Sequence, residues 1–154
     1  MTPPTAGTPA PTATGAGRML IAVYGVFALA ATSRAAVQIV RDLPEAPVAY
    51  LLSALSAVIY VVATVALART GRLARRTAWT AVAAELTGVL LIGTLSLVAP
   101  QDFPRATVWS GYGAGYGYVP LVLPLIGMWW LRRTGHPAVA PTAQPTPQPG
   151  PSVD

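Results

Sequence analysis

The chain has 154 residues, of which 53% are hydrophobic and only 10% are charged, whereas a typical soluble domain is about 25% charged. It contains no cysteine and a single histidine, His136, which excludes disulfides and thiolate chemistry and leads us to expect no cofactor and no metal site. The net charge of +5 comes entirely from arginines, which lie at the ends of apolar runs. This placement indicates membrane topology, and we expect no nucleic-acid partner.

The two ends of the chain are predicted to be disordered tails. Residues 1–17 and 134–154 consist mainly of Pro, Thr, Ala and Gly. Such segments do not bury enough apolar surface to offset the entropy lost on ordering. Alternatively, either tail is expected to bind a partner in an extended polyproline conformation, although solvated tails fit the composition better.

Four apolar runs lie between the tails, at residues 19–40, 48–68, 77–99 and about 114–131. A helix needs about 20 residues to cross about 30 Å of hydrocarbon, so the fourth run is short unless it begins nearer Tyr112. The second run has no charged residue and no polar face, which argues against a soluble helical bundle. The sequence therefore predicts an all-α membrane protein in which residues 18–133 form four transmembrane helices.

Arginine placement predicts the orientation of these helices. Seven arginines lie before the first run, between the second and third runs, or after the fourth: Arg18, Arg69, Arg72, Arg75, Arg76, Arg132 and Arg133. The other two connections contain only Arg41 and Arg105, together with acidic residues. Because cytoplasmic loops are enriched in basic residues, we expect both termini in the cytoplasm and a multi-pass protein of the plasma membrane.

Aromatic residues are predicted to mark the two membrane boundaries. At the inner boundary the sequence places Trp79, Trp129 and Trp130. At the outer boundary it places Tyr50, Trp109, Tyr112, Tyr116 and Tyr118. A rival interpretation is a signal peptide cleaved after Ala30, although the uncharged leader is atypical and apolar character resumes after Ser33.

Glu85 is the most unusual residue, because it lies eight residues into the third run. A carboxylate at that depth is costly, so we expect it to be neutral, paired or exposed to a water-filled cavity. Its helical neighbours Ala78, Ala81 and Gly88 are small, which predicts that this face packs against another helix. Glu85 is then either a hydrogen-bonded link between helices, which we favour, or a site for a proton or cation.

Arg34 and Gln38 form a second candidate polar site within the membrane. Together with Arg41 they occupy positions i, i+4 and i+7, which gives one polar stripe at the outer end of the first helix. By counting residues, Arg34 and Glu85 lie at different depths. We therefore expect the partner of Arg34 among the acidic residues of the outer connections, Asp42, Glu45 and Asp102.

Glycine and proline shape the segment that leads into the fourth run. Residues 110–118 contain Gly-Tyr-Gly twice, but no pore helix precedes them, so a potassium-channel filter is disfavoured. We expect the glycines to allow close packing and the tyrosines to anchor at the interface. Pro120 and Pro124 are predicted to kink the outer half of the fourth helix.

Two functions of different classes fit these features. No serine, histidine and acid combination and no carboxylate pair occurs in the membrane region, so we expect no enzyme and no catalytic residue. The first function is a non-enzymatic membrane component that packs against a partner or a second copy, with small-residue faces at Ser53/Ala57 and Ala84/Gly88. The alternative is a small proton- or cation-coupled transporter or channel subunit that uses Glu85.

Three stretches carry a resemblance to a known family: residues 46–68 (APVAYLLSALSAVIYVVATVALA), 85–100 (ELTGVLLIGTLSLVAP) and 103–133 (FPRATVWSGYGAGYGYVPLVLPLIGMWWLRR). Together they resemble an uncharacterised four-helix integral membrane protein family of actinobacteria. The resemblance implies a plasma-membrane location and carries no activity to any residue. The small multidrug transporters are similar only in size, because their essential glutamate lies in the first helix.

Overall fold

The computed structural model describes residues 15–134, and every regular element in this range is helical. Its elements are α1 (Gly15–Asp42), α2 (Pro47–Ala68), α3 (Arg72–Val98), the short 3-10 helices η1 (Pro100–Asp102) and η2 (Ser110–Tyr116), and α4 (Val119–Arg133). The predicted tails fall mostly on residues 1–14 and 135–154, which lie outside the described range. Residues 15–17, predicted to belong to the first tail, are instead the first turn of α1.

Three helices, α1, α2 and α3, are long and apolar enough to cross a membrane. With 28, 22 and 27 residues, they are about 42, 33 and 40 Å long at the usual helical rise. The 15 residues of α4 give only about 22 Å, and α4 qualifies as a span only together with η2, from which it is bent by 99°. The prediction of an all-helical chain is thus confirmed for the described residues, and three of its helices, or four spans if the bent pair is one, are long and apolar enough to cross a membrane.

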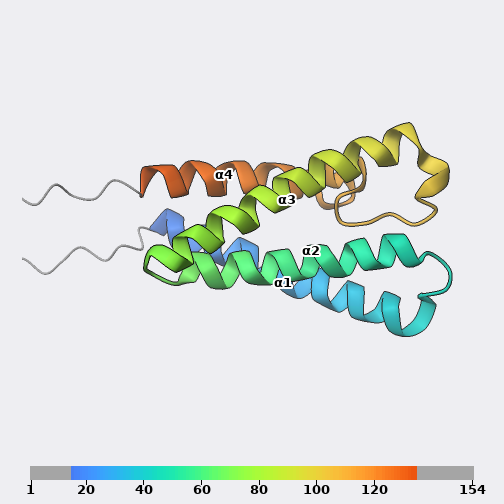
Figure 1. The fold of residues 1–154 in the computed structure, drawn as a ribbon, viewed down its shortest axis with the longest axis horizontal. Coiled ribbons are helices and arrows are strands. Elements are labelled where there is room, and N and C mark those ends of the chain that lie inside the picture. Colours follow the sequence, from blue (N-terminus) through green and yellow to red (C-terminus); the bar gives the residue numbers. More distant parts are fainter. Residues whose placement is uncertain (1–14, 135–154) are drawn as a thin grey trace, which may run out of the picture.

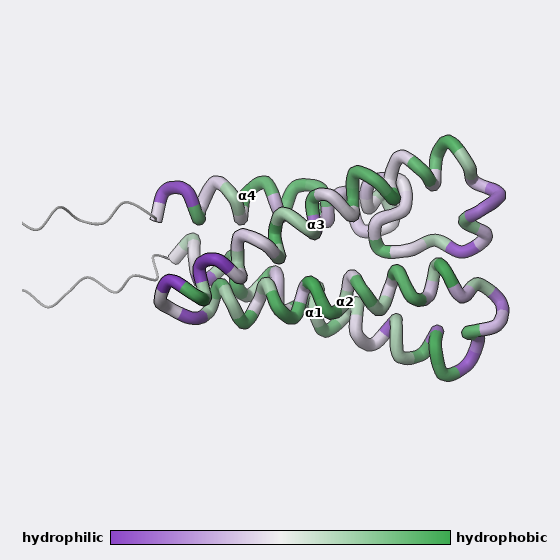
Figure 2. Tube along the Cα trace, in the orientation of Figure 1, coloured by the Kyte–Doolittle hydropathy of each residue, from purple (hydrophilic) through white to green (hydrophobic). Residues whose placement is uncertain are grey.

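The helices form an elongated bundle (Figure 1). The beginning of α1, the α2–α3 connection and the end of α4 lie at one end of the bundle, called here the arginine-rich end. The α1–α2 connection and residues 99–118 lie at the other, called the outer end. Hydrophilic residues gather at the two ends and hydrophobic residues between them (Figure 2), as expected for helices surrounded by lipid.

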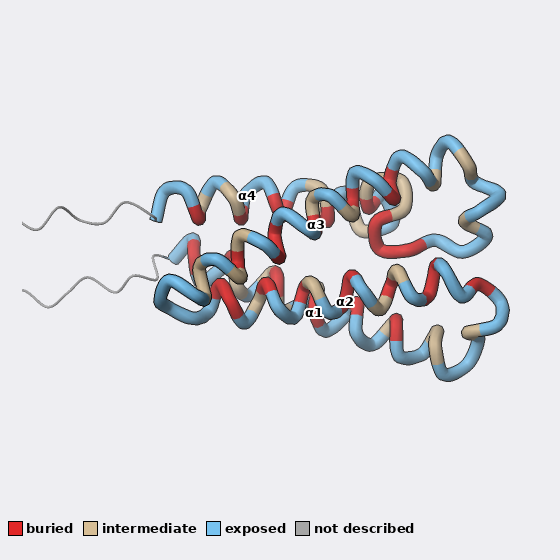
Figure 3. Tube along the Cα trace, viewed as in Figure 1, coloured by how far each residue is buried: buried red, intermediate tan, exposed pale blue. Residues whose placement is uncertain are grey.

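Small side chains form much of the buried surface between α1 and α2. Ala28, Ala31 and Ala35 of α1 and Ala57 and Ala63 of α2 are buried in one core cluster. Buried positions recur along the inward sides of the helices, whereas much of the outward surface is exposed (Figure 3). Because the hydrophobic effect is weak within lipid, such close packing of small residues is a main source of helix association in membranes.

The starts of α3 and α4 differ most from the prediction. Helix α3 begins at Arg72, five residues before the predicted residue 77, so the arginines before its apolar run are already helical. Helix α4 begins at Val119 rather than near residue 114, because Gly117 (φ 63°) and Tyr118 (φ 61°) adopt left-handed conformations that interrupt it. The abrupt change of direction thus lies before Pro120, which occupies the first turn of α4, where a missing N–H costs little.

The outer connection between α3 and α4 folds back into the bundle. Val108 and Trp109 are both only 2% exposed, and the buried stretch is visible in Figure 3. A β-carbon on Gly88 would lie 2.7 Å from the Trp109 indole, so α3 needs glycine there for the ring to pack. The expectation that Trp109 anchors at the membrane boundary is therefore wrong, because its ring is part of the core.

Candidate functional site

Glu85 lies in the interior of the bundle, with no part of its side chain exposed. Ala81 and Ala78, one and two turns before it on α3, are also buried, which confirms that the small-residue face of this helix is a packing face. The Tyr24 hydroxyl of α1 donates a hydrogen bond of 2.8 Å to Glu85 Oε2. The carboxyl group thus links two helices that are far apart in the sequence.

Residues from the other elements complete the surroundings of this carboxyl group. The fully buried Tyr60 of α2 brings its hydroxyl close to both Glu85 and Trp109. The ring of Tyr60 also lies against that of Tyr24, with centroids 6.2 Å apart. We call Tyr24, Tyr60, Glu85 and Trp109 the Glu85 cluster; it joins α1, α2, α3 and the outer connection.

Helix α4 contributes space to the cluster rather than a polar group. A β-carbon at Gly127 would lie 3.2 Å from the Tyr24 hydroxyl and 3.3 Å from Val82. This is tighter than ordinary van der Waals contact, so the glycine allows α4 to approach α1 and α3 at the level of the hydrogen bond. All four α-helices, α1 to α4, therefore meet around Glu85.

Three polar atoms of the cluster are buried without a hydrogen-bond partner in the described part of the chain: Glu85 Oε1, the Tyr60 hydroxyl and Trp109 Nε1. Buried polar groups are normally satisfied, and an unsatisfied one costs about 1–3 kcal/mol. These atoms would be satisfied by a proton bound to the Glu85 carboxyl group, or by a small polar molecule or ion bound beside it. Residues 15–134 contain no group of three His, Cys, Asp or Glu side chains able to hold a metal ion.

No protein-family model, curated protein or solved structure matches this chain.

Arg34 and Gln38 lie apart from Glu85, at the outer end of α1. Arg34 donates hydrogen bonds to the Tyr116 hydroxyl (2.8 Å) and to the Ala106 carbonyl oxygen (2.9 Å). Its guanidinium carbon also lies 5.9 Å from the centre of the Tyr116 ring. The expectation of an acidic partner for Arg34 is wrong; this residue holds the outer connection onto α1.

A polar pocket of about 520 Å³ opens beside these two residues. Its lining includes Arg34 and Gln38 from α1 and Glu45 and Arg105 from the two outer connections. Glu45 and Arg105 form a salt bridge, and the hydrogen bond from Arg105 holds the pKa of the Glu45 carboxyl below its usual range. The acid is therefore charged at neutral pH and ties the two outer connections together.

The candidate helix-packing residues are mostly covered by the chain itself. Ser53 and Ala57 are buried, and the Ser53 hydroxyl bonds to the Ala49 carbonyl oxygen of its own helix. Gly88 is covered by Trp109, whereas Ala84 is exposed. Ser53 and Ala57 therefore pack mainly within the bundle, and only Ala57 also lines an apolar groove between α1 and α2.

Sequence reasoning did not identify Tyr24, Tyr60 or Trp109 as partners of Glu85. For Tyr60, a signal comes from counting residues between each side chain and the arginine-rich end of its helix. Tyr60 lies nine residues before Arg69, and Glu85 lies nine residues after Arg76, which places both about 13 Å from the arginine-rich end. No comparable signal exists for Trp109, whose position depends on how the outer connection folds back.

Proposed function

We propose that the chain crosses the plasma membrane four times, with both termini in the cytoplasm. Two features support this topology. Seven of the ten arginines belong to the end of the bundle where α1 begins and α4 ends: Arg18, Arg69, Arg72, Arg75, Arg76, Arg132 and Arg133. Asp42, Glu45 and Asp102 belong to the opposite end, where they do not oppose the orienting effect of the arginines.

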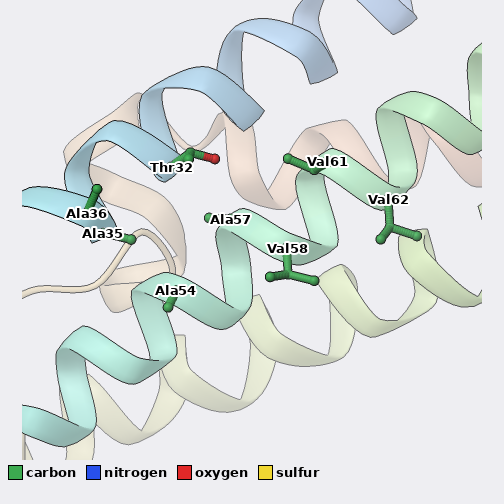
Figure 4. A pocket seen from close by; sticks show the side chains of 8 residues that line it. All are labelled: Thr32, Ala35, Ala36, Ala54, Ala57, Val58, Val61 and Val62. Atoms are coloured by element: carbon green, nitrogen blue, oxygen red, sulfur yellow. The ribbon is translucent and has the colours of Figure 1, made fainter. Parts of the chain in front are cut away.

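Within this topology, we propose a non-enzymatic membrane component that binds another transmembrane helix. The observation that carries this proposal is an apolar groove of about 360 Å³ between α1 and α2, shown in Figure 4. Its lining consists of four alanines, three valines and a threonine: Thr32, Ala35, Ala36, Ala54, Ala57, Val58, Val61 and Val62. Small side chains on both walls let a partner helix approach closely, which is how transmembrane helices associate.

The arrangement around Glu85 supports the same reading. The acid accepts a hydrogen bond from Tyr24 and is enclosed by α1, α2, α3 and α4, so it stabilises the bundle rather than lining an open path. A bundle fixed in this way presents its groove as a rigid surface, and rigidity reduces the entropy lost on binding.

The test is photo-crosslinking in native membranes from residue 36, which lines the groove and is exposed. We expect a discrete protein adduct that the groove-filling substitution Ala54→Phe abolishes. Residue 30 is the matched control, because it is an exposed alanine of the same helix outside the groove. Differently tagged copies of the chain distinguish a second copy from another protein, and adducts with lipid alone at both positions contradict the proposal.

A second candidate function, a proton- or cation-coupled transporter or channel subunit, is favoured by one specific observation. Glu85 and the Tyr60 hydroxyl are buried near each other, and neither Glu85 Oε1 nor this hydroxyl has a hydrogen-bond partner among residues 15–134. Intramembrane acids commonly mark ion pathways. Its test is a pH-dependent flux in proteoliposomes. If Glu85→Gln assembles normally but loses that flux, the acid has a transport role; if flux and the phenotypes of a deletion strain are unchanged, this function is excluded.

A further inference from the structure

A pocket of about 630 Å³ lies at the arginine-rich end, between the α2–α3 connection and the end of α4. Its apolar lining includes Ile21, Leu67, Ala78, Trp130 and Leu131. The Trp130 ring packs against Gly17, where a β-carbon would lie 2.8 Å from it. Four arginines also line the pocket: Arg69, Arg72, Arg75 and Arg133.

These arginines differ in whether their guanidinium groups already interact with other residues. Arg75 donates to the Leu131 carbonyl oxygen and the Thr134 hydroxyl, and Arg133 stacks over the Trp129 ring at 4.3 Å. Arg69 and Arg72 are exposed and form neither a side-chain hydrogen bond nor an ion pair with any residue from 15 to 134. Arg75 therefore fixes the wall of the pocket, and Arg69 and Arg72 offer free donors at its edge.

The charge of this pocket is not neutralised by the described chain. The acidic residues between 15 and 134 are Asp42, Glu45, Asp102 and Glu85. The first three belong to the outer connections and the fourth is enclosed in the bundle. An anionic ligand therefore meets no acidic side chain of residues 15–134 at this end, and guanidinium groups match the acceptor oxygens of a phosphate particularly well.

An apolar groove continues from the same pocket along α2 and α3. It has a volume of about 420 Å³ and is lined by Val61, Val62, Val65, Leu73, Ala74 and Thr77. It shares Ala66, Arg69 and Thr70 with the pocket. A cationic pocket at the arginine-rich end thus joins an apolar groove that runs along α2 and α3 toward the middle of the bundle. A lipid has the same arrangement, because its charged headgroup is joined to apolar acyl chains.

We propose that this pocket binds the phosphate headgroup of an anionic phospholipid, with Arg69 and Arg72 as phosphate donors and one acyl chain in the adjoining groove. Basic pockets between transmembrane helices on the cytoplasmic side bind anionic headgroups in the same way. The phosphate site does not depend on a partner helix, because the groove of Figure 4 includes none of these arginines. The acyl-chain groove shares only Val61 and Val62 with it.

The experiment is native mass spectrometry of the full chain released from nanodiscs that contain equal amounts of phosphatidylglycerol and phosphatidylcholine. We expect one phosphatidylglycerol molecule retained per chain. The pocket variant combines Arg69→Gln with Arg72→Gln; the control combines Arg18→Gln with Arg76→Gln, which removes the same charge at the same end but outside the pocket. Loss of even one charge-assisted hydrogen bond should weaken retention by at least about tenfold in the pocket variant relative to the control.

Two further arms identify the source of the phosphate. Val65→Trp fills the groove and should weaken lipid retention while leaving the arginines in place. Inorganic phosphate in large excess should not displace the lipid; displacement would assign the pocket to a soluble anion and overturn the proposal. Equal weakening in the pocket and control variants, with unchanged circular dichroism, would show only diffuse charge attraction and overturn it as well.

Discussion

The indole ring of Trp109 occupies the space in which any residue other than glycine at position 88 would carry its β-carbon. Three ring atoms would lie within 2.9 Å of that carbon. Because Trp109 belongs to the outer connection and Gly88 to the middle of α3, this contact fixes the connection inside the bundle.

Gly88→Ala should therefore destabilise the protein by about 1–3 kcal/mol, the usual cost of overpacking a core. The control is Gly25→Ala on α1, where the nearest atom, Thr64 Cγ2, would lie at 3.8 Å. Replacing this helical glycine should be neutral or stabilising by about 0.5–1 kcal/mol. Thermal unfolding followed by circular dichroism in detergent measures both, and equal effects would contradict the packing of Trp109 on α3.

Removing the hydroxyl group should change the free energy of unfolding differently at the two tyrosines of the Glu85 cluster. Tyr24→Phe removes the only hydrogen-bond donor to Glu85 among residues 15–134, and should cost about 1–3 kcal/mol. Tyr60→Phe removes a hydroxyl that makes no hydrogen bond with any residue from 15 to 134, so it should be neutral or stabilising. The same unfolding assay distinguishes them, and a double-mutant cycle with Glu85→Gln should show coupling for Tyr24 only.

The outer end should loosen in acid. Since the hydrogen bond from Arg105 lowers the pKa of Glu45 in the folded protein, the ion pair contributes stability at neutral pH that is lost as the pH falls through this lowered value. The protection of residues 99–106 against hydrogen exchange, taken relative to the intrinsic exchange rate at each pH, should decrease below about pH 4, near the ordinary pKa of glutamate. Glu45→Gln should show low protection at every pH, whereas Asp102→Asn, which replaces an acid in the same segment outside the ion pair, should preserve the pH dependence.

The proposed orientation is testable because the chain has no cysteine of its own. Single cysteines at Thr70, in the α2–α3 connection, and at Asp102, in the outer connection, report opposite sides of the membrane. A membrane-impermeant maleimide should label intact cells at residue 102 and label residue 70 only after lysis. The reverse pattern would invert the topology, and labelling of both residues in intact cells would exclude the four-span arrangement.

The helical architecture could be predicted because its signals are local. The apolar runs, their length and the arginines beside them identified α1, α2 and α3, and the small neighbours of Glu85 identified its packing face. Each of these inferences needs only the helical period and the thickness of the bilayer. The start of α3 was placed five residues late because arginines were assigned to a loop, although long charged side chains at a helix end readily reach the membrane surface.

The partners within the site could not be predicted in the same way. Arg34 bonds to Tyr116 rather than to an acid, and Trp109 enters the core, because the outer connection folds back at left-handed residues near Gly113 and Tyr118. Tyrosine at φ near 60° is strained and is adopted only when tertiary contacts demand it. Such contacts join residues far apart in the sequence, and a single sequence contains no record of them.

The short α4 has a consequence for the surrounding membrane. A helix of about 22 Å falls short of a hydrocarbon layer about 30 Å thick, whereas α1, at about 42 Å, exceeds it. In the proposed four-span topology, lipids beside α4 compress and those beside α1 stretch or accept a tilted helix, at a cost of fractions of a kcal/mol for each Å. This topology therefore predicts a thickness gradient in the surrounding bilayer, and membranes of different thickness should favour the protein unequally.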